Sequence, residues 1–417
     1  MRQTVWAACT GSVFTMLLTG SAVGALLIKQ LGGTDFQSML PASILLLAQT
    51  VQIPVSLRIP PGRGKAFMLR AWLAALGILT AAFFLPAFLS GRGGVTIFLV
   101  VLGAGVLVNG SGSTFWFPLL HDLVPVHRRG RFFGRLRAIW SFVSFSAILA
   151  AGFFLGKNPA VWRFQVVFGV ALVLYFVRIF FVARIPAGNS LSGGLDFEDW
   201  RHYVRNLFRQ RALVVFLAYY GVLGFCMGFL SQPLVLYMKA RGFPAKDNVI
   251  IFSFHTLGTV LSYLISGSLV DRFGTKRIFL VAHLVLCLTC FGVVGIGMGP
   301  NEYAMFLLPA AMIVAGGIIA ASGVACTAQL FHLIPNRGRA FYLSLAMIIT
   351  SVGVAVSPLL VGCVLDVVGD GWRRDFGPVT LDMFQVLLLI AGVLSLLAIG
   401  ILQAVPNVHP NRETAEK

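Results

Sequence analysis

The sequence predicts an all-α membrane protein in which twelve transmembrane helices form two six-helix bundles related by pseudo-two-fold symmetry. Three observations predict this fold: an apolar composition, twelve apolar runs long enough to cross a bilayer, and an internal repeat at half the chain length. Of the 417 residues, 58% are hydrophobic and 11% are charged, and the mean hydropathy is +0.89. A soluble domain carries roughly 25% charged residues, so a water-soluble fold would leave much apolar surface uncovered. Lipid is therefore the expected solvent for most of the chain.

The net charge of +18 does not indicate a nucleic-acid partner. The basic residues are scattered in short breaks between apolar runs, without the clustered basic face that follows a phosphate backbone. Loops lying against an anionic membrane surface explain this charge more simply. The cysteines all fall in apolar stretches, so we expect no disulfide framework, no metal site and no cofactor; they are Cys9, Cys226, Cys287, Cys290, Cys326 and Cys363.

The apolar runs follow one another with short breaks rich in Gly, Pro, Arg and Asn. A transmembrane helix needs about 20 mostly apolar residues. The expected spans cover residues 4–28, 38–57, 67–90, 95–119, 137–156, 164–185, 212–238, 248–270, 277–298, 304–330, 341–366 and 381–404. The longest break, 186–211, reads as a cytoplasmic linker between an N-terminal bundle (1–185) and a C-terminal bundle (212–404), followed by a cytoplasmic tail (405–417).

The distribution of lysine and arginine predicts the orientation. If the N-terminus is cytoplasmic, 22 of the 32 basic residues lie in inner segments and 9 in outer loops, while Arg178 lies within a span. Inner loops of membrane proteins carry the excess of Lys and Arg, so both termini are expected in the cytoplasm. The short loops are typical of a multi-pass protein of the bacterial inner membrane.

The two halves repeat each other. The segment Leu123-Val-Pro-Val-His-Arg-Arg-Gly-Arg131 returns as Leu333-Ile-Pro-Asn-Arg-Gly-Arg339, and Lys29 with Gly32 returns as Lys239 with Gly242. These offsets are close to half of the chain length. The pattern indicates a duplication with both copies in parallel topology, an established transporter architecture.

One loop resembles a known family signature. Gly267-x-Leu269-x-Asp271-Arg272-x-Gly274-x-Lys276-Arg277, between spans eight and nine, is similar to the loop signature of the major facilitator superfamily. The corresponding loop between spans two and three keeps a glycine and basic residues but lacks the aspartate. Twelve spans, the central loop and the Arg-Gly-Arg segments extend the resemblance over the whole chain.

The resemblance implies a gate of charged groups on the cytoplasmic side. Asp271 with Arg337 or Arg339 would close it in one conformation, and Asp122 with Arg129 or Arg131 would be the counterpart in the first half. The alternative is that these charges only set the topology. In either case, a glycine such as Gly267 near a helix end lets two helices approach closely.

The resemblance also implies that spans one, four, seven and ten line a central cavity and that two, five, eight and eleven form the moving interface. Polar side chains deep in a membrane need a partner or water, which makes those in these spans candidate cavity residues. They are Thr15, Thr19, Gln49, Gln52, Asn109, Ser113, Trp116, Tyr219, Tyr220, Gln232, His255 and Gln329. The small residues Gly110 to Gly112 favour close helix packing. Arg178, two turns from the end of span six, is expected to extend toward the membrane surface.

All fourteen acidic residues map to loops, tails or span ends. Carriers coupled to protons usually keep a carboxylate near the membrane midplane. Its absence favours a secondary active or facilitative transporter of a small organic solute, neutral or anionic, over the alternative of a proton-coupled multidrug efflux antiporter. No paired catalytic groups and no phosphate-binding loop are present, so neither an enzyme nor an ATP-driven pump is expected. The expected partners are the solute, the lipid bilayer and a coupling ion such as H⁺, with the chain acting as a monomer.

Overall fold

The computed structural model describes residues 2–60, 62–124, 129–186, 200–334, 339–369, 372–376 and 379–408. Within them, twelve helical segments are long and apolar enough to cross a membrane, as the sequence predicts. They run over Arg2–Gln30, Asp35–Arg58, Gly64–Ala87, Gly91–Leu120, Phe132–Leu155, Val161–Ala183, Arg211–Ala240, Ala245–Phe273, Thr275–Met298, Asn301–Leu333, Phe341–Val368 and Met383–Gln403.

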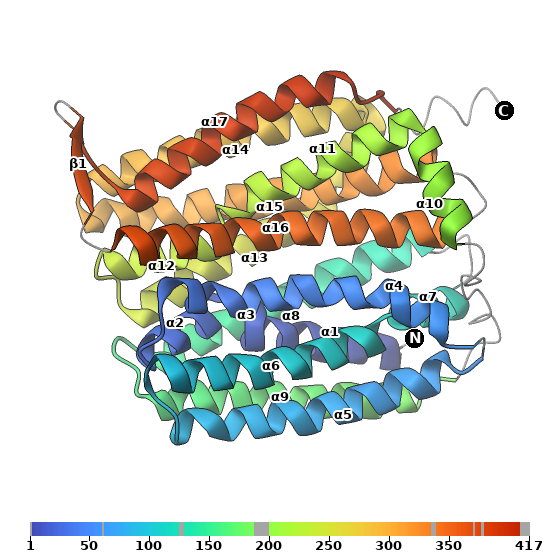
Figure 1. Ribbon diagram of the computed structural model, residues 1–417, viewed down its shortest axis with the longest axis horizontal. Coiled ribbons are helices and arrows are strands. Elements are labelled where there is room, and N and C mark those ends of the chain that lie inside the picture. Colours follow the sequence, from blue (N-terminus) through green and yellow to red (C-terminus); the bar gives the residue numbers. More distant parts are fainter. Residues whose placement is uncertain are drawn as a thin grey trace.

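The first six spans pack against one another as one bundle (Figure 1). Their elements are α1 (Arg2–Thr15), a π-helical turn η1 (Met16–Gly20), α2 (Ala22–Gln30), α3 (Asp35–Leu47), a 3₁₀ turn η2 (Ala48–Val51), α4 (Gln52–Arg58), α5 (Gly64–Phe84), a 3₁₀ turn η3 (Leu85–Ala87), α6 (Gly91–Ser113), α7 (Trp116–Leu123), α8 (Arg129–Leu155) and α9 (Val161–Ala183).

The second bundle follows the short helix α10 (Trp200–Arg209), and its only strands within the described residues form one hairpin before the last span. Its elements are α11 (Arg211–Gly228), α12 (Gln232–Ala240), α13 (Ala245–Phe273), α14 (Thr275–Met298), α15 (Asn301–Leu333), α16 (Arg339–Val368), β1 (Arg373–Phe376), β2 (Val379–Asp382) and α17 (Met383–Gln403).

Local signals begin several of these helices. Thr34 accepts the backbone N–H of Gln37 and Gln37 returns the bond, which forms a capping box at the start of α3. Asp382 and Gln385 form the same box at the start of α17. The buried residues of both bundles form one hydrophobic cluster, while many large apolar side chains stay exposed on the outer surface, such as Phe88 and Phe306. An apolar outer surface is what a lipid environment requires.

The molecule has two distinct ends (Figure 1). The start of α1 and the end of α17 lie at one end, called here the terminal end, and the β1–β2 hairpin lies at the other, called the hairpin end. The bundles meet through α3 with α16, through α8 with α13, and through α2 with α12.

Candidate functional site

The hairpin end is closed by a carboxylate that bridges the two bundles. Asp366, near the end of α16, accepts hydrogen bonds from the backbone N–H groups of Asp35, at 2.8 Å, and Phe36, at 3.1 Å. These N–H groups begin α3 of the other bundle, where the helix has no internal acceptor for them and carries a partial positive charge. Lys29 forms an ion pair with Asp35 at 2.7 Å beside this contact. We call the contact of Asp366 with α3 the outer clasp.

The equivalent contact in the other half uses backbone carbonyls. The N–H of Ala245 donates to the carbonyl of Lys157 at 3.1 Å, and that of Lys246 donates to the carbonyl of Gly156 at 2.9 Å. Ala245 and Lys246 begin α13 and stand 210 residues after Asp35 and Phe36, the same offset as in the sequence repeat. The two halves therefore close the hairpin end in the same way, with a titratable acceptor on one side only.

Deeper contacts join the bundles near the middle of the spans. Ser43 on α3 donates to the carbonyl of Ala355 on α16 at 3.0 Å, and the rings of Phe145 and Phe254 lie 6.2 Å apart between α8 and α13. Closer to the terminal end, the guanidinium of Arg137 lies 5.8 Å from the ring centre of Tyr263. The hydrogen bonds between the bundles described above thus lie at the hairpin end or in the middle of the spans.

The first and seventh spans are broken at equivalent positions. Ser21, with φ −123° and ψ 177°, separates η1 from α2, and Ser231, with φ −104° and ψ −108°, separates α11 from α12. The two serines are 210 residues apart. Each break leaves the N-terminus of a short helix within its span, the kind of half-helix end that lies beside substrates in transporters. At α2 the hydroxyl of Ser21 accepts the N–H of Val23 at 3.4 Å, and at α12 Pro233 in the first turn has no N–H to donate. Thr19 and Gln232 stand next to these breaks, and both are buried.

Of the other expected cavity residues, two glutamines lie at the bundle interface and Tyr220 packs within the second bundle. The amide of Gln52 donates to that of Gln49, and both lie in η2 and α4, which contact α16 across the interface. Tyr220 stacks on Phe216 with 11° between the rings and lies beside Thr350 and Cys326.

Two more expected cavity residues have different surroundings. Thr15 is half-buried and bonds back to the carbonyl of Gly11 at 2.9 Å. His255 on α13 stacks on Phe252, and its Nε2 atom is buried with no hydrogen-bond partner among the described residues.

Three further candidates point into the first bundle instead. Asn109 accepts the hydroxyl of Tyr175 at 2.8 Å through its side chain, and its carbonyl accepts the indole N–H of Trp72 at 3.3 Å. The hydroxyl of Ser113 donates to the same carbonyl at 2.8 Å. Trp116 is 5% exposed and lies against Trp72. These side chains therefore join spans three, four and six.

The expectation that Arg178 extends to the membrane surface is wrong, because the side chain is 8% exposed. Its guanidinium carbon lies 4.0 Å from the ring centre of Trp72 and 5.5 Å from that of Trp116. Gly11 provides the space, since a Cβ at that position would lie 2.6 Å from Nε of Arg178. Two aromatic faces thus replace water around the cation. The arrangement requires residues of spans one, three, four and six, so no single span of the sequence could indicate it.

A buried polar chain that the sequence analysis missed occupies the second bundle. Tyr219 bonds to Nε2 of His283 at 3.0 Å, and Nδ1 of His283 bonds to Ser395 at 2.9 Å. All three side chains are fully buried. The chain joins spans seven, nine and twelve, the repeat equivalents of spans one, three and six. Tyr219 therefore contacts spans nine and twelve in the bundle interior, whereas its neighbour Tyr220 lies beside Thr350 and Cys326 on α16 and α15.

At the terminal end, Gln329 links the signature loop to the segment that follows α17. The amide of Gln329 contacts the hydroxyl of Thr275 and donates to the carbonyl of Pro406 at 2.8 Å. Gln329 is fully buried, so its amide is used to hold the loop and the segment after α17. Gly274 has φ +77° and ends α13, the left-handed conformation that glycine adopts without strain.

The other signature residues have different surroundings. Gly267 has nothing within 4 Å of an added Cβ, so the expected close helix approach there is wrong. Close approach occurs in span four, where a Cβ on Gly110 would lie 2.8 Å from the carbonyl oxygen of Ala48. Asp271, Arg272 and Arg277 are exposed and Lys276 donates to the carbonyl of Gln403 at 2.9 Å.

The positions of the side chains that are expected to pair with Asp271 are not described by the structure. Arg337 is not among the described residues, and the side chains of Asp122, Arg129, Arg131 and Arg339 are not described. The cytoplasmic gate therefore stays a prediction. Every acidic residue within the described helices lies near a helix end, and no group of three metal-binding side chains occurs in the described part of the chain.

The comparisons with known proteins agree with this architecture. The family model described as Major Facilitator Superfamily matches residues 5–332 and 250–417. The Bacillus subtilis (strain 168) protein YwtG, whose name assigns it provisionally to metabolite transport, is 27% identical over 185 residues, which cover 43% of this chain and 38% of YwtG. The chain thus matches less than half of that relative's length.

Solved structures match over nearly the whole chain. The nucleoside transporter NupG superposes with a TM-score of 0.70 at 13% identity, covering 97% of this chain and 99% of NupG. The inward open xylose transporter XylE from E. coli superposes with a TM-score of 0.69 at 14% identity, covering 97% of this chain and 96% of XylE. At these identities the likeness shows the fold.

Proposed function

Because the chain belongs to the Major Facilitator Superfamily, we propose that this transporter moves a small organic solute, neutral or anionic, by alternating access between its two bundles. The paired breaks at Ser21 and Ser231 carry the proposal, since each places a helix N-terminus near the middle of the membrane. Ser21 already accepts the N–H of Val23 at 3.4 Å and Pro233 has no N–H, so the remaining N–H groups and the positive helix ends would be what suits hydroxyl, carbonyl or carboxylate groups of a solute. Gln49, Gln52 and Tyr220 would supply side-chain contacts nearby.

The solved relatives suggest which solutes to test first. NupG is named as a nucleoside transporter and XylE as a xylose transporter, so sugars and nucleosides are the first candidates. The described spans hold no carboxylate away from their ends, which favours such solutes over lipophilic cations and disfavours the multidrug antiporter alternative.

The orientation and state form part of the same proposal. The excess of basic residues in the segments at the terminal end supports a cytoplasmic location for both termini, and the linker 186–211 would then join the two moving bundles on that side. The outer clasp closes the opposite face, which would be the periplasmic side in this orientation. We propose the bacterial inner membrane as the location and a monomer as the working unit.

The test is uptake by the full chain reconstituted in liposomes. Radiolabelled xylose and uridine are offered with and without an inward proton gradient, and Gln49→Ala is compared with Thr80→Ala, an exposed threonine on α5 that bonds only to its own helix. We expect saturable uptake of one solute and its reduction in Gln49→Ala alone. Uptake of lipophilic cations in place of both solutes would refute the proposed substrate class.

His255 is the candidate for proton coupling within this proposal. Its unpartnered, buried Nε2 lies on a helix of the bundle interface, and histidine titrates in the physiological range when exposed. If the proton gradient accelerates uptake, His255→Gln is expected to abolish that acceleration and leave exchange of solute without a gradient intact. Acceleration that persists in His255→Gln would exclude this residue as the coupling group.

A further inference from the structure

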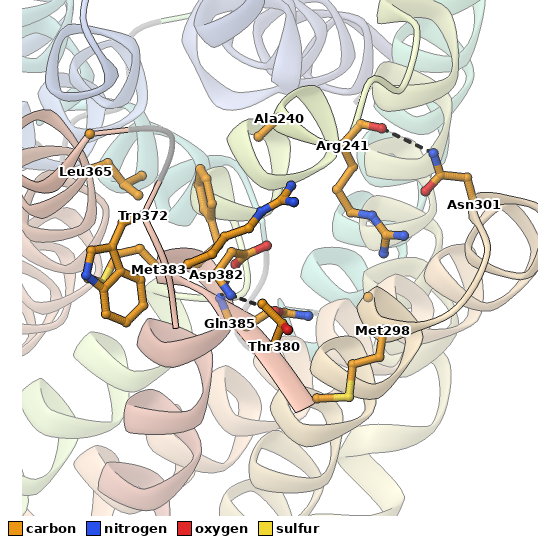
Figure 2. Close-up of a pocket in the computed structure, with 14 residues that line it drawn as sticks. Ala240, Arg241, Met298, Asn301, Leu365, Trp372, Thr380, Asp382, Met383 and Gln385 are labelled. Atoms are coloured by element: carbon orange, nitrogen blue, oxygen red, sulfur yellow. Dashed lines mark hydrogen bonds between the residues drawn. The ribbon is translucent and has the colours of Figure 1, made fainter. Parts of the chain in front are cut away.

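A cavity of about 600 Å³ opens at the hairpin end of the second bundle (Figure 2). Its lining comes from the end of α12, the α14–α15 connection, the end of α16, the β1–β2 hairpin and the first turn of α17. Small-molecule pockets have volumes of about 300–1,000 Å³, so the cavity has room for one small ligand. It lies within the second bundle, apart from the breaks at Ser21 and Ser231, and the proposed transport path does not use it.

The charges of the lining favour an anion. Arg241 and Arg373 contribute two guanidinium groups, and Asp382 is the lining's acidic residue. One oxygen of Asp382 already accepts the backbone N–H of Gln385 at 2.8 Å as the cap of α17. Helices α15 and α17 both begin in the lining, at Asn301 and Met383, and helix N-termini stabilise negative charge.

Arg241 is held in place before any ligand binds. Its guanidinium donates to the carbonyl of Gly299 at 2.9 Å and to that of Ile296 at 3.4 Å, and it lies 5.8 Å from the ring centre of Tyr237. Asn301 donates in turn to the Arg241 carbonyl at 3.2 Å, the bond drawn in Figure 2. Covering the end of α14 would by itself explain these contacts. A guanidinium has five N–H donors, however, so donors remain for a ligand in the cavity.

The side chain of Arg373 makes no hydrogen bond to the described backbone of the kind that holds Arg241, although its charge interacts with Asp382. It is exposed on β1, opposite Asp382 in the hairpin register. The next residue, Arg374, is equally exposed but points to the other face of the strand and does not line the cavity. Trp372, Met298 and Met383 add apolar surface to the lining. The cavity therefore combines an exposed cation, a hydrogen-bonded cation and an apolar wall.

We propose that this cavity binds a small organic anion, a carboxylate or sulfonate with an apolar body, at a site separate from the central transport path. Guanidinium groups recognise such oxyanions through paired hydrogen bonds, and the tryptophan and methionines pack against the apolar body. The ligand would also touch Leu365 and Gly369, which flank Asp366 of the outer clasp. Binding at this site would thus act on the helix end that closes the hairpin side.

The experiment uses the purified full chain in a neutral maltoside detergent, with benzenesulfonate as the probe and benzyl alcohol as its uncharged counterpart. A ligand of the folded state raises the unfolding temperature in proportion to ln(1+[L]/Kd). We expect the unfolding temperature to rise with benzenesulfonate concentration in this logarithmic form for the wild type and for Arg374→Gln, and the fitted affinity to be at least tenfold weaker for Arg373→Gln. An unchanged affinity in Arg373→Gln, or an equal rise with benzyl alcohol, would overturn the proposal.

A transport measurement separates this site from the central one. Arg373→Gln is expected to lose the benzenesulfonate response while taking up the transported solute at the wild-type rate. If benzenesulfonate itself is transported and Arg373→Gln stops that transport, the cavity belongs to the path and the claim of a separate site fails. If no offered solute is transported, the proposed function is at fault, while the binding result decides the anion site independently.

Discussion

Replacing Asp366 by alanine removes the outer clasp and is expected to open the hairpin end. The carboxylate accepts two backbone N–H groups of the opposite bundle, at 2.8 and 3.1 Å. Hydrogen bonds to a charged acceptor contribute about 1.5–3 kcal/mol each when shielded. Asp366 is exposed, so we discount this value for competition with water. Loss of a helix cap costs about 0.5–2 kcal/mol, and the charge at the helix end adds about 0.3–1 kcal/mol.

A combined loss of about 2 kcal/mol changes the equilibrium between closed and open forms by about 30-fold, because 1.4 kcal/mol corresponds to a factor of ten. The effect is confined to one side of the interface, since the equivalent contact at α13 uses the backbone carbonyls of Gly156 and Lys157. Those carbonyls are unaffected by the substitution and limit how far the hairpin end separates.

The assay follows a reporter cysteine between the bundles. Ser43 is fully buried at the α3–α16 contact, so Ser43→Cys reacts with a membrane-impermeant thiol reagent only when the hairpin end opens. Cys363 is the one exposed cysteine, and the background therefore carries Cys363→Ser. We expect Asp366→Ala to raise the labelling rate by about 30-fold while the open form stays a minority.

The control is Asp375→Ala, which removes an exposed carboxylate of the hairpin that does not bridge the bundles. Equal labelling rates in Asp366→Ala and Asp375→Ala would refute the reasoning, because they would show that Asp366 does not hold the closed form. Faster labelling in both would point to a general charge effect at this end.

Three further substitutions test other parts of the molecule. Asp271→Asn is expected to slow transport without changing the yield or thermal stability of the folded protein, because the resemblance places Asp271 in the cytoplasmic gate; wild-type uptake would remove that role. Arg178→Lys keeps the charge but loses the planar stack on Trp72. The free energy of unfolding should fall by about 1–2 kcal/mol, which lowers the thermal unfolding midpoint. An unchanged midpoint would contradict the buried cation–π contact. Burial raises the pKa of the Asp382 carboxyl, so it takes up a proton at a higher pH than an exposed aspartate. Benzenesulfonate should therefore bind more tightly as the pH falls through the titration of this carboxyl; this pH dependence should disappear in Asp382→Asn, and its persistence there would assign it to another group.

The sequence predicts the spans well because each depends on its own apolar run. Lipid demands helices long enough to cross the bilayer, and no knowledge of neighbouring spans is needed to recognise one. The repeat is similarly visible, and the 210-residue offset between Lys29 and Lys239 also relates Ser21 to Ser231. The breaks themselves were not expected, since neither serine interrupts the apolar run in which it stands.

Side-chain roles were harder to predict, because they depend on contacts between spans. Asn109 and Trp116 look like cavity residues along one helix, but the structure directs both toward spans three and six. The burial of Arg178 depends on aromatic rings that other spans supply, and the sequence of its own span does not reveal them. His283 gives no sequence signal at all, because a lone histidine in an apolar run is informative only when Tyr219 and Ser395 are seen beside it.

The breaks in the first and seventh spans also determine how thick the barrier at the hairpin end is. Helices α2 and α12 contain nine residues each, which at 1.5 Å per residue amounts to about 13 Å, less than half of a hydrocarbon core about 30 Å thick. Helices of this length are not stable alone in water, so each depends on its neighbours for its shape. The two contact each other and form a plug that a solute resting at the breaks would meet at once. Passage toward the hairpin side would then require these two short helices to part, together with release of the outer clasp and of the contact of α13 with Gly156 and Lys157.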